Sequence, residues 1–358
     1  MRIVFLIQDC TTIGGTERVT CCLSSEMARQ GNEVAIISVF GVDGHCKFEL
    51  DSRVKFVVAS NEDYNLRMNK FHRLAKVGKM TDMIESNALM READVVIAQK
   101  FFAAMLAVNA GYKDKLIVGD HYPYAVYSRP LLKLRDYIYR KAKMVVVLTD
   151  AYRKEYEQHL VKNVTVIENM VPIPVEYVEG AREKVILAVG RLAREKGFDT
   201  LLEAIALIDG RLGEWKVEIC GEGDERAKLE EMINNLGLQN RVVLRGAVAD
   251  ISAEYRRASF GVMPSHFEGF PMVLLEAAAK QLPMVAFDCP YGPKSILSHG
   301  GGVLVENQNV VALANAILHM ADNSVLRKKC SEETRNIVEK YSPEKIYQQW
   351  IQIIEKCL

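Results

Sequence analysis

The chain has 358 residues, which exceeds one ordinary core of roughly 100–200 residues, so its length predicts two domains. Its 46 Lys and Arg residues balance 46 Asp and Glu residues, and the lack of a basic excess argues against a dedicated nucleic-acid-binding protein. Hydrophobic residues make up 49% and charged residues 26% of the chain, which excludes a mainly disordered protein.

No segment of the sequence is typical of secretion or of a membrane span. The first apolar run, at residues 3–7, is far shorter than the about 20 residues that cross a bilayer, and no later run reaches that length. The eight cysteines contain no CxxC pair and no metal-ligand spacing. We therefore expect a cytoplasmic protein whose cysteines are mostly reduced and structural.

Short β-branched segments alternate with amphipathic helical segments in both halves, which is typical of βαβ units and parallel sheets. The first half has predicted strands at residues 3–7, 34–39, 54–58, 95–98, 116–118 and 144–148. The second half has them at residues 185–189, 217–220, 242–244, 260–263, 284–287 and 303–305. The pattern predicts an α/β fold with two Rossmann-like, doubly wound parallel-sheet domains facing a cleft.

The domain boundary is predicted at Val171-Pro172-Ile173-Pro174, because two prolines in three residues favour an extended linker over a central strand. Residues 1–172 would form the N-terminal domain and residues 173–340 the C-terminal domain. In residues 341–358, Ser342 can cap a helix that Pro343 opens. We expect this helix to pack across the domain junction.

Ligands of such sheets bind beyond the carboxyl ends of the strands. After the first predicted strand, Gly14 and Gly15 lead into a helix that begins at about Thr16. Two glycines at a strand-to-helix turn let backbone amides approach an anion at the positive end of the helix. Ordinary turn chemistry explains these glycines equally well.

At the start of the second half, Arg191 and Lys196 lie in the loop between a predicted strand and a helix at residues 200–208. A forked guanidinium and a compact ammonium in one loop suit a diphosphate, although a solvated basic loop is the alternative. We expect Arg194 in the same loop to be simply solvated. Gly221-Glu222-Gly223 forms another tight turn after the next strand.

A third motif runs from Ser265 to Ala279. Glu268 precedes Gly269, and a helix that begins near Pro271 would aim its free amides at a ligand beside Glu268. Glu276 falls on an otherwise apolar helix face, where a carboxylate is costly to bury without a hydroxyl or cationic partner. A surface position for Glu276 is the alternative.

The chain resembles the retaining nucleotide-sugar glycosyltransferases of family 4, which have the two-domain GT-B fold. Three motifs in order carry the resemblance: the Gly-Arg-Leu…Lys-Gly loop at 190–197, the Gly-Glu-Gly turn and the pair Glu268/Glu276. The resemblance covers essentially the whole chain. Residues 288–293, Asp-Cys-Pro-Tyr-Gly-Pro, are similar to a sequence common in the bacterial branch that assembles polysaccharides and lipid-linked saccharides.

The resemblance implies a role for each matching position. Arg191 and Lys196 would stabilise the departing diphosphate of the donor, and Glu276 would bind its ribose hydroxyls. Glu268 would lie near the donor sugar, which the amides around Gly269, Phe270, Pro271 and Met272 would hold, and Gly14 and Gly15 would flank the diphosphate. His121, which follows a first-half strand, matches a histidine that faces the reacting centre, so catalytic roles are implied for His121, Glu268, Arg191 and Lys196.

No group of carboxylates is arranged for Mg²⁺, and enzymes of this type generally need no catalytic metal, so we expect neither a metal nor another cofactor. The donor would be a co-substrate, with a UDP-sugar favoured. No separate nucleophile stands out, which agrees with retention assisted by the donor phosphate.

Two basic segments in the first half are candidates for contact with the acceptor or an anionic membrane. Residues 67–79 have five basic residues and no acid, and residues 129–143 have six basic residues against one acid. The candidate contact residues are Lys70, Arg73, Lys76, Arg135, Arg140 and Lys141. Such helices can bind an anionic leaflet or a lipid pyrophosphate, but basic solvent-facing helices explain them nearly as well.

The resemblance and the basic segments thus imply a cytoplasmic transferase, either soluble or peripheral on the inner face of the plasma membrane. It would move a hexose or N-acetylhexosamine onto a saccharide acceptor, which would be lipid-linked if the basic segments bind it. One alternative is a nucleotide-sugar epimerase of the same fold, which would need acid/base residues at the sugar and gives the basic segments no role. Another is a non-catalytic saccharide-binding subunit, against which the intact Arg191, Lys196, Glu268 and Glu276 argue.

Overall fold

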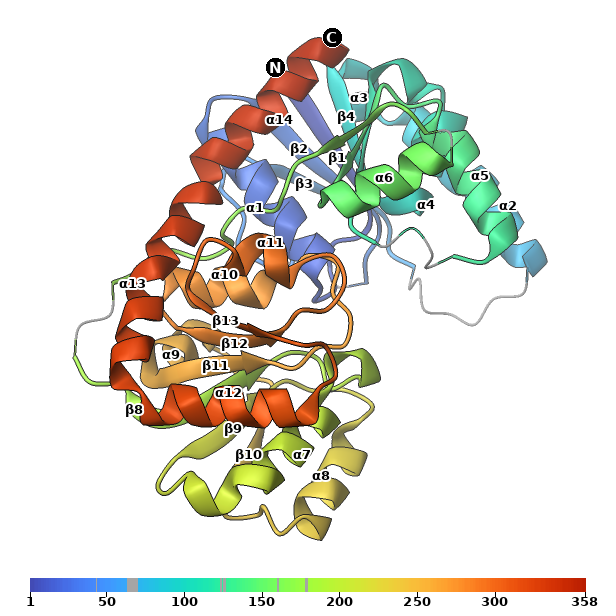
Figure 1. The fold of residues 1–358 in the computed structure, drawn as a ribbon. Coiled ribbons are helices and arrows are strands. Elements are labelled where there is room, and N and C mark those ends of the chain that lie inside the picture. The colour runs from blue at the N-terminus through green and yellow to red at the C-terminus, as the bar shows by residue number, and fades with distance from the viewer. Residues whose placement is uncertain (43, 63–69, 123, 125–126, 160, 178–179) are drawn as a thin grey trace. The chain divides into compact units, whose positions relative to one another are not determined.

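The computed structural model describes residues 1–358 except 43, 63–69, 123, 125–126, 160 and 178–179 (Figure 1). The chain divides into two compact units. The first comprises Met1–Met170 and Pro343–Leu358, and the second Val171–Ser342. The division thus falls directly before the proline-containing segment Val171-Pro172-Ile173-Pro174, and the last helix belongs to the first unit.

The first unit contains a seven-stranded parallel sheet in the order β3-β2-β1-β4-β5-β6-β7. Its strands are β1 (Arg2–Asp9), β2 (Glu33–Phe40), β3 (Lys55–Ser60), β4 (Val95–Gln99), β5 (Leu116–Asp120), β6 (Met144–Val147) and β7 (Val164–Val166). Its helices are α1 (Gly15–Arg29), α2 (Lys70–Ser86), α3 (Ala88–Glu92), α4 (Lys100–Asn109), α5 (Arg129–Tyr139), α6 (Asp150–Gln158) and α14 (Pro343–Cys357), with a short turn η1 (Tyr112–Lys115). Six of the strands were predicted; the edge strand β7, with three residues, was missed.

The second unit contains a six-stranded parallel sheet in the order β10-β9-β8-β11-β12-β13. Its strands are β8 (Glu183–Val189), β9 (Lys216–Cys220), β10 (Val242–Gly246), β11 (Ala258–Met263), β12 (Met284–Phe287) and β13 (Gly302–Val305). Its helices are α7 (Phe198–Ile208), α8 (Arg226–Asn235), α9 (Ile251–Arg257), α10 (Met272–Ala279), α11 (Pro293–Leu297), α12 (Val310–Asp322) and α13 (Ser324–Lys340), with short turns η3 (Arg194–Lys196) and η4 (Asp209–Arg211). All six strands were predicted, and the two doubly wound sheets confirm the predicted fold class.

Each unit has its own apolar core, as two separate domains require. In the second unit, buried side chains of α7 and α12 pack on the central strands. In the first unit, Ile346, Trp350 and Ile354 of α14 join the core formed by α1 and the strands β1, β2 and β4. These three residues are four positions apart along the helix and so lie on one face, which explains how a helix so far along the chain completes the first unit.

The order of the strands determines which loops come together. In both sheets the first strand of the unit, β1 or β8, is paired on both sides. The turn after this strand therefore lies beside the turns of its neighbours at the carboxyl edge. Among the helices of the described chain, none combines the length and apolarity needed to span a bilayer.

Candidate functional site

The turn between β8 and α7 carries the basic residues that were predicted to meet a diphosphate. Gly197 ends η3 with a left-handed φ of 64°, and a Cβ at this position would lie 2.1 Å from the carbonyl oxygen of Pro264. The backbone amide of His266 also donates to the carbonyl of Glu195 over 2.9 Å. Only glycine fits here, because the turn lies directly against the segment that follows β11.

Lys196 forms an ion pair with Glu268, with 2.7 Å between Nζ and Oε1. The hydroxyl of Ser265 donates to the same carboxylate oxygen over 2.7 Å. Both charged side chains are largely enclosed, with 23% of Lys196 and 12% of Glu268 exposed. The structure therefore brings together two predicted site residues that are 72 positions apart in the sequence.

Arg191 lies in the same turn but is far more open. Its side chain is 70% exposed, and its guanidinium donates to Glu195 over 2.7 Å. Arg194 is exposed, as expected. An exposed forked donor next to an enclosed ammonium can bind an incoming anion with little loss of existing structure.

The Gly-Glu-Gly turn after β9 packs on the backbone of this basic turn. The amide of Leu192 donates to the carbonyl of Glu222 over 2.8 Å, and the amide of Gly190 to the carbonyl of Cys220 over 3.0 Å. A Cβ at Gly221, where φ is 146°, would lie 1.8 Å from the carbonyl oxygen of Gly190. The turn therefore supports the basic loop from one side.

Helix α10 begins at Met272, directly after Pro271, close to the predicted start. Gly269 is half-buried and Phe270 is buried. The ring of Phe270 lies edge to face with that of Tyr341 at a centroid separation of 5.7 Å. Phe270 therefore anchors the turn in the core, and only its backbone is available to a ligand.

Glu276 is buried on α10, with 4% of its surface exposed. The hydroxyl of Tyr255, on α9, donates to Glu276 Oε2 over 2.7 Å. This is the hydroxyl partner that a carboxylate at an apolar helix face requires. The alternative of a surface position for Glu276 is wrong.

In the first unit, Gly14 is the N-cap of α1 and Gly15 is its first residue. The φ of Gly14 is −165°, which any residue can adopt, but a Cβ there would lie 2.1 Å from Glu17 Oε2. Glu17 is buried, and its Oε1 is 3.4 Å from Lys100 Nζ. This turn thus presents a paired carboxylate behind its glycines, unlike the basic turn of the second unit.

His121 follows β5, and its Nε2 lies 2.7 Å from Gln99 Oε1. Burial and, to a smaller degree, the cation of Lys100 lower the pKa of His121 to about 3. The imidazole is therefore neutral near pH 7, with Nε2 donating to the amide oxygen and Nδ1 left as an acceptor. His121 also borders a cavity of about 10 Å³, lined by Gln99, Asn169 and Trp350 among others.

Arg135 was predicted to belong to a basic surface, and this prediction is wrong. Its side chain is 0% exposed, and its guanidinium lies over the rings of Tyr124 and Tyr156 at 4.1 and 4.8 Å. It also donates to the carbonyl of Tyr124 and pairs with Asp136. Its position on the inner face of α5 explains the error, because the sequence shows the charge but not the aromatic residues that surround it.

The outer face of α5 remains basic and apolar. Arg140 and Lys141 are exposed just beyond its end, and Lys141 lies over the ring of Tyr137 at 4.2 Å. Three large apolar side chains on α5 are also 42–50% exposed: Leu131, Leu134 and Tyr137. We call these three residues, with Lys133, Arg140 and Lys141, the α5 surface.

The second basic segment is only partly described. Lys70 and Arg73 fall on α2, but their side chains lie outside the described residues. Lys76 forms an ion pair with Glu62, to which Lys79 also comes within 3.5 Å. In the described part of this segment, the basic side chains are therefore partly neutralised by an acid from the preceding loop.

Sequence reasoning missed one group of side chains. Among the described residues, Cys10, Cys21 and Cys46 offer three possible metal-ligand atoms within 4.8 Å of one another. Hydrogen bonds from the other two thiols, which outweigh its burial, lower the pKa of Cys46. The same hydrogen bonds raise the pKa of Cys10. The spacing of these cysteines matches no motif, so the sequence contained no signal for the cluster.

Two family models match the chain. Residues 13–173 match "Glycosyltransferase Family 4", and residues 173–337 match "Glycosyl transferases group 1". The amylovoran biosynthesis glycosyltransferase AmsD of Erwinia amylovora is 28% identical over 99% of both chains. An alpha-1,4-N-acetyl-D-galactosaminyltransferase of Campylobacter jejuni, named for a PP-undecaprenol-linked saccharide, is 26% identical over 99% of this chain and 98% of its own length.

The fold is also similar to that of known glycosyltransferase structures. The crystal structure of Anabaena HepE in complex with UDP superposes with a TM-score of 0.77 at 19% identity, covering 99% of this chain and 100% of that chain. The two family models together span residues 13–337, and the two parallel-sheet domains are those that the resemblance implied. The chain therefore belongs to the family 4 glycosyltransferases and is an enzyme with the GT-B fold.

Proposed function

We propose that the protein transfers a hexose or N-acetylhexosamine from a UDP-sugar to a saccharide acceptor in bacterial polysaccharide assembly, with retention at the anomeric carbon. The observation that carries this proposal is the enclosed Lys196–Glu268 pair at the carboxyl edge of the second sheet. An ammonium held next to glycine turns can stabilise the charge that develops on a departing diphosphate.

In the proposed reaction, the bond between C1 of the sugar and the diphosphate oxygen breaks, and its electron pair leaves with UDP. The acceptor hydroxyl oxygen bonds to C1 on the same face, and its proton passes to the departing phosphate oxygen. Lys196 and the exposed Arg191 would bind that diphosphate. No metal enters the proposal.

We propose the remaining donor contacts from the roles that the resemblance implies. Glu276, held by Tyr255, would accept hydrogen bonds from the ribose hydroxyls. Glu268 and the amides of residues 269–272 would hold the sugar. From the first unit, the turn at Gly14 and Gly15 would meet the diphosphate, and neutral His121 would offer Nδ1 as an acceptor at the reacting centre.

UDP is proposed as the donor nucleotide because HepE, which shares the fold, is named in complex with UDP. A lipid-linked acceptor is supported by the name of the Campylobacter relative and by the α5 surface. Apolar side chains flanked by lysine and arginine suit the boundary of an anionic leaflet. We therefore propose that the enzyme acts as a peripheral protein at the inner face of the plasma membrane.

The test is a thermal-shift screen of the purified protein against UDP, GDP, ADP and their common sugars, each with and without EDTA. A ligand that binds only the folded state raises the unfolding temperature. We expect a selective shift with UDP and UDP-sugars that EDTA does not change. The Lys196→Ala variant should lose this shift, whereas the control Arg194→Ala should keep it.

Two outcomes would contradict the proposal. A selective shift with GDP or ADP would reject UDP as the donor nucleotide. No shift with any nucleotide at millimolar concentration, from a folded sample, would favour a non-catalytic subunit.

A further inference from the structure

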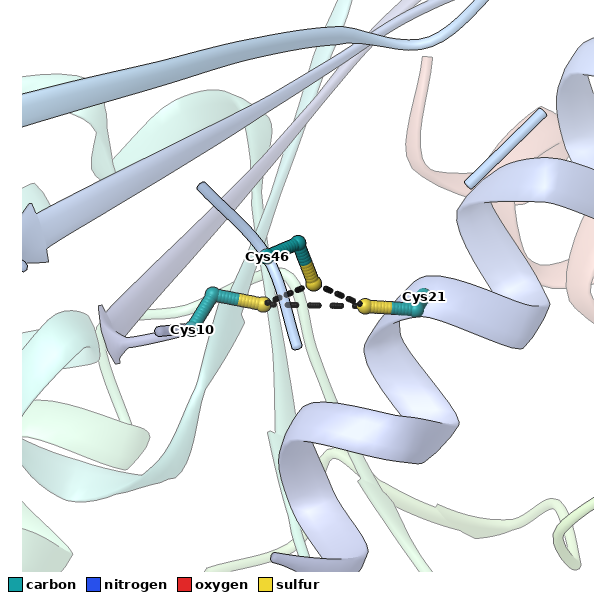
Figure 2. A group of neighbouring side chains, drawn as sticks. All are labelled: Cys10, Cys21 and Cys46. Atoms are coloured by element: carbon teal, nitrogen blue, oxygen red, sulfur yellow. Dashed lines mark hydrogen bonds between the residues drawn. The ribbon is translucent and has the colours of Figure 1, made fainter. Parts of the chain in front are cut away.

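Three cysteines from separate parts of the first unit direct their sulfur atoms toward one point (Figure 2). The Sγ atom of Cys10 is 3.7 Å from that of Cys21 and 3.7 Å from that of Cys46. The Sγ atoms of Cys21 and Cys46 are 2.9 Å apart. We call this group the thiol cluster. It is not part of the proposed donor or acceptor contacts.

The fold explains why these cysteines meet. Cys10 directly follows β1, Cys21 lies on α1, and Cys46 lies in the loop after β2. Strands β1 and β2 are parallel neighbours, so their carboxyl ends share one edge of the sheet. Ten residues separate Cys10 from Cys21 in the sequence, and 24 separate Cys21 from Cys46, yet the fold brings the three side chains together.

The loop that carries Cys46 is held on α1 by contacts that do not involve sulfur. The guanidinium of Arg18 lies 5.5 Å from the ring centroid of Phe48. The amide of Asp51 donates to the hydroxyl of Ser25 over 3.0 Å, and its carboxylate lies 3.5 Å from the guanidinium of Arg29. The approach of Cys46 to α1 is therefore part of the packing of this loop.

Two of the three distances match a metal site, and the third lies between the values for a metal site and a disulfide. In tetrahedral zinc sites the Zn–S distance is about 2.3 Å, which places neighbouring sulfurs about 3.8 Å apart. Two of the three separations are within about 0.1 Å of this value, and the third requires Cys46, which is half-buried on its loop, to move outward by about 0.9 Å. A disulfide has an S–S length of about 2.05 Å and would leave one thiol over.

We propose that Cys10, Cys21 and Cys46 bind one Zn²⁺ through three thiolates, with a solvent molecule as the fourth ligand. Thiolate sulfur is the ligand type that favours zinc over magnesium or calcium. The amides of Lys47 and Phe48 donate hydrogen bonds to the Cys46 sulfur, as groups around metal ligands commonly do.

The bound ion would be structural and separate from sugar transfer. It would tie the loop after β2 to the turn between β1 and α1. The ligand in that turn, Cys10, lies four residues before Gly14. Because metal binding to a folded site adds to folding stability, zinc should raise the unfolding temperature of the first unit.

The experiment uses the full chain without a histidine tag, purified in a non-thiol reductant. Its metal content is measured by elemental analysis, before and after incubation with Zn²⁺ and desalting. We expect about one zinc per chain. Replacement by Co²⁺ should give sulfur-to-cobalt charge-transfer absorption in the near ultraviolet and the visible bands of a tetrahedral ion. Zinc should also raise the unfolding temperature.

Single variants then assign the ligands. Cys10→Ser, Cys21→Ser and Cys46→Ser should each weaken zinc binding at least about 10-fold and reduce the charge-transfer band. Cys22→Ser is the matched control, since it alters the next residue of the same helix outside the cluster, and it should retain both. The wild-type measurements decide the matter even if a variant does not fold.

Two results would overturn the proposal. One is a reduced, folded wild-type protein that retains no zinc after desalting and gives no cobalt charge-transfer band. The other is a Cys21–Cys46 disulfide, found by mass spectrometry of peptides from protein purified without reductant, that persists when zinc is present throughout.

Discussion

The turns after the first strands of the two sheets, β1 and β8, have the same topology but opposite chemistry. Both join a fully paired strand to a helix through glycines. The turn after β8 presents the cations Lys196 and Arg191, whereas the turn after β1 contributes Cys10 to the thiol cluster and is followed by the buried carboxylate of Glu17.

This difference shows that the fold alone does not make an anion site. The amide ends of a helix are common to both turns, but the turn after β8 itself contains the basic side chains of Arg191 and Lys196, whereas residues 10–14 between β1 and α1 contain none. In the first unit, a cation from another strand end, Lys100, is paired with Glu17 behind the glycines. We therefore assign most of the binding energy for the donor diphosphate to the second unit, and the predictions below test this comparison.

The largest expected effect is that of Lys196→Ala on sugar transfer. Removing a cation from a developing diphosphate charge should lower kcat/KM by about 10²–10³-fold. Steady-state kinetics with the donor found by the thermal screen measure it, with Arg194→Ala as a control from the same turn. If Lys100→Ala in the first unit reduced the rate as much as Lys196→Ala, the contrast between the two turns would fail.

The next effect concerns the α5 surface. Each basic residue near an anionic leaflet contributes about 1 kcal/mol, so changing Lys133, Arg140 and Lys141 to Gln should weaken vesicle binding by roughly 100-fold. Co-sedimentation with phosphatidylglycerol-containing vesicles measures this. The control changes Lys184, Lys328 and Lys329 to Gln, which removes equal charge from exposed sites of the second unit. Equal losses in both variants would show only a general charge effect.

A smaller effect is expected in the core of the second unit. Tyr255→Phe removes the hydroxyl that donates to the buried carboxylate of Glu276. Losing this hydrogen bond to a buried charged group should lower the free energy of unfolding by about 1–3 kcal/mol. Urea unfolding measures it. Measuring Tyr255→Phe again in the Glu276→Gln background shows whether the loss of stability depends on the charge of Glu276. In that background, Tyr255→Phe should lower the free energy of unfolding by less.

The smallest effect is a pH dependence at His121. Its pKa is about 3 in the folded state and about 6.5 in an unfolded chain. As the pH falls from about 6.5 toward 3, the unfolded state binds a proton that the folded state does not, so stability is lost in this window. Wild type should lose more stability than His121→Gln between pH 7.5 and pH 5 in urea unfolding. If wild type and His121→Gln lost equal stability, the imidazole of His121 would take up a proton in the folded state as readily as in the unfolded state.

Much of the architecture could be predicted from local patterns. Twelve of the thirteen strands that the structure describes were expected from β-branched segments, because a strand buried on both faces reads as a continuous apolar run. The exception, β7, has three residues and lies at the edge of its sheet, where no long apolar run is needed. Glycine turns after strands indicated the edges at which ligands bind.

The sequence by itself determined the two parallel-sheet domains, the basic turn at Arg191 and Lys196, and the need of Glu276 for a partner. Only the tertiary structure decided which partner that is, that Lys196 meets Glu268, that Arg135 is enclosed by tyrosines, and that three cysteines converge. Local patterns report the period and charge of a segment. Strand order brings distant turns together, and no local pattern contains that information.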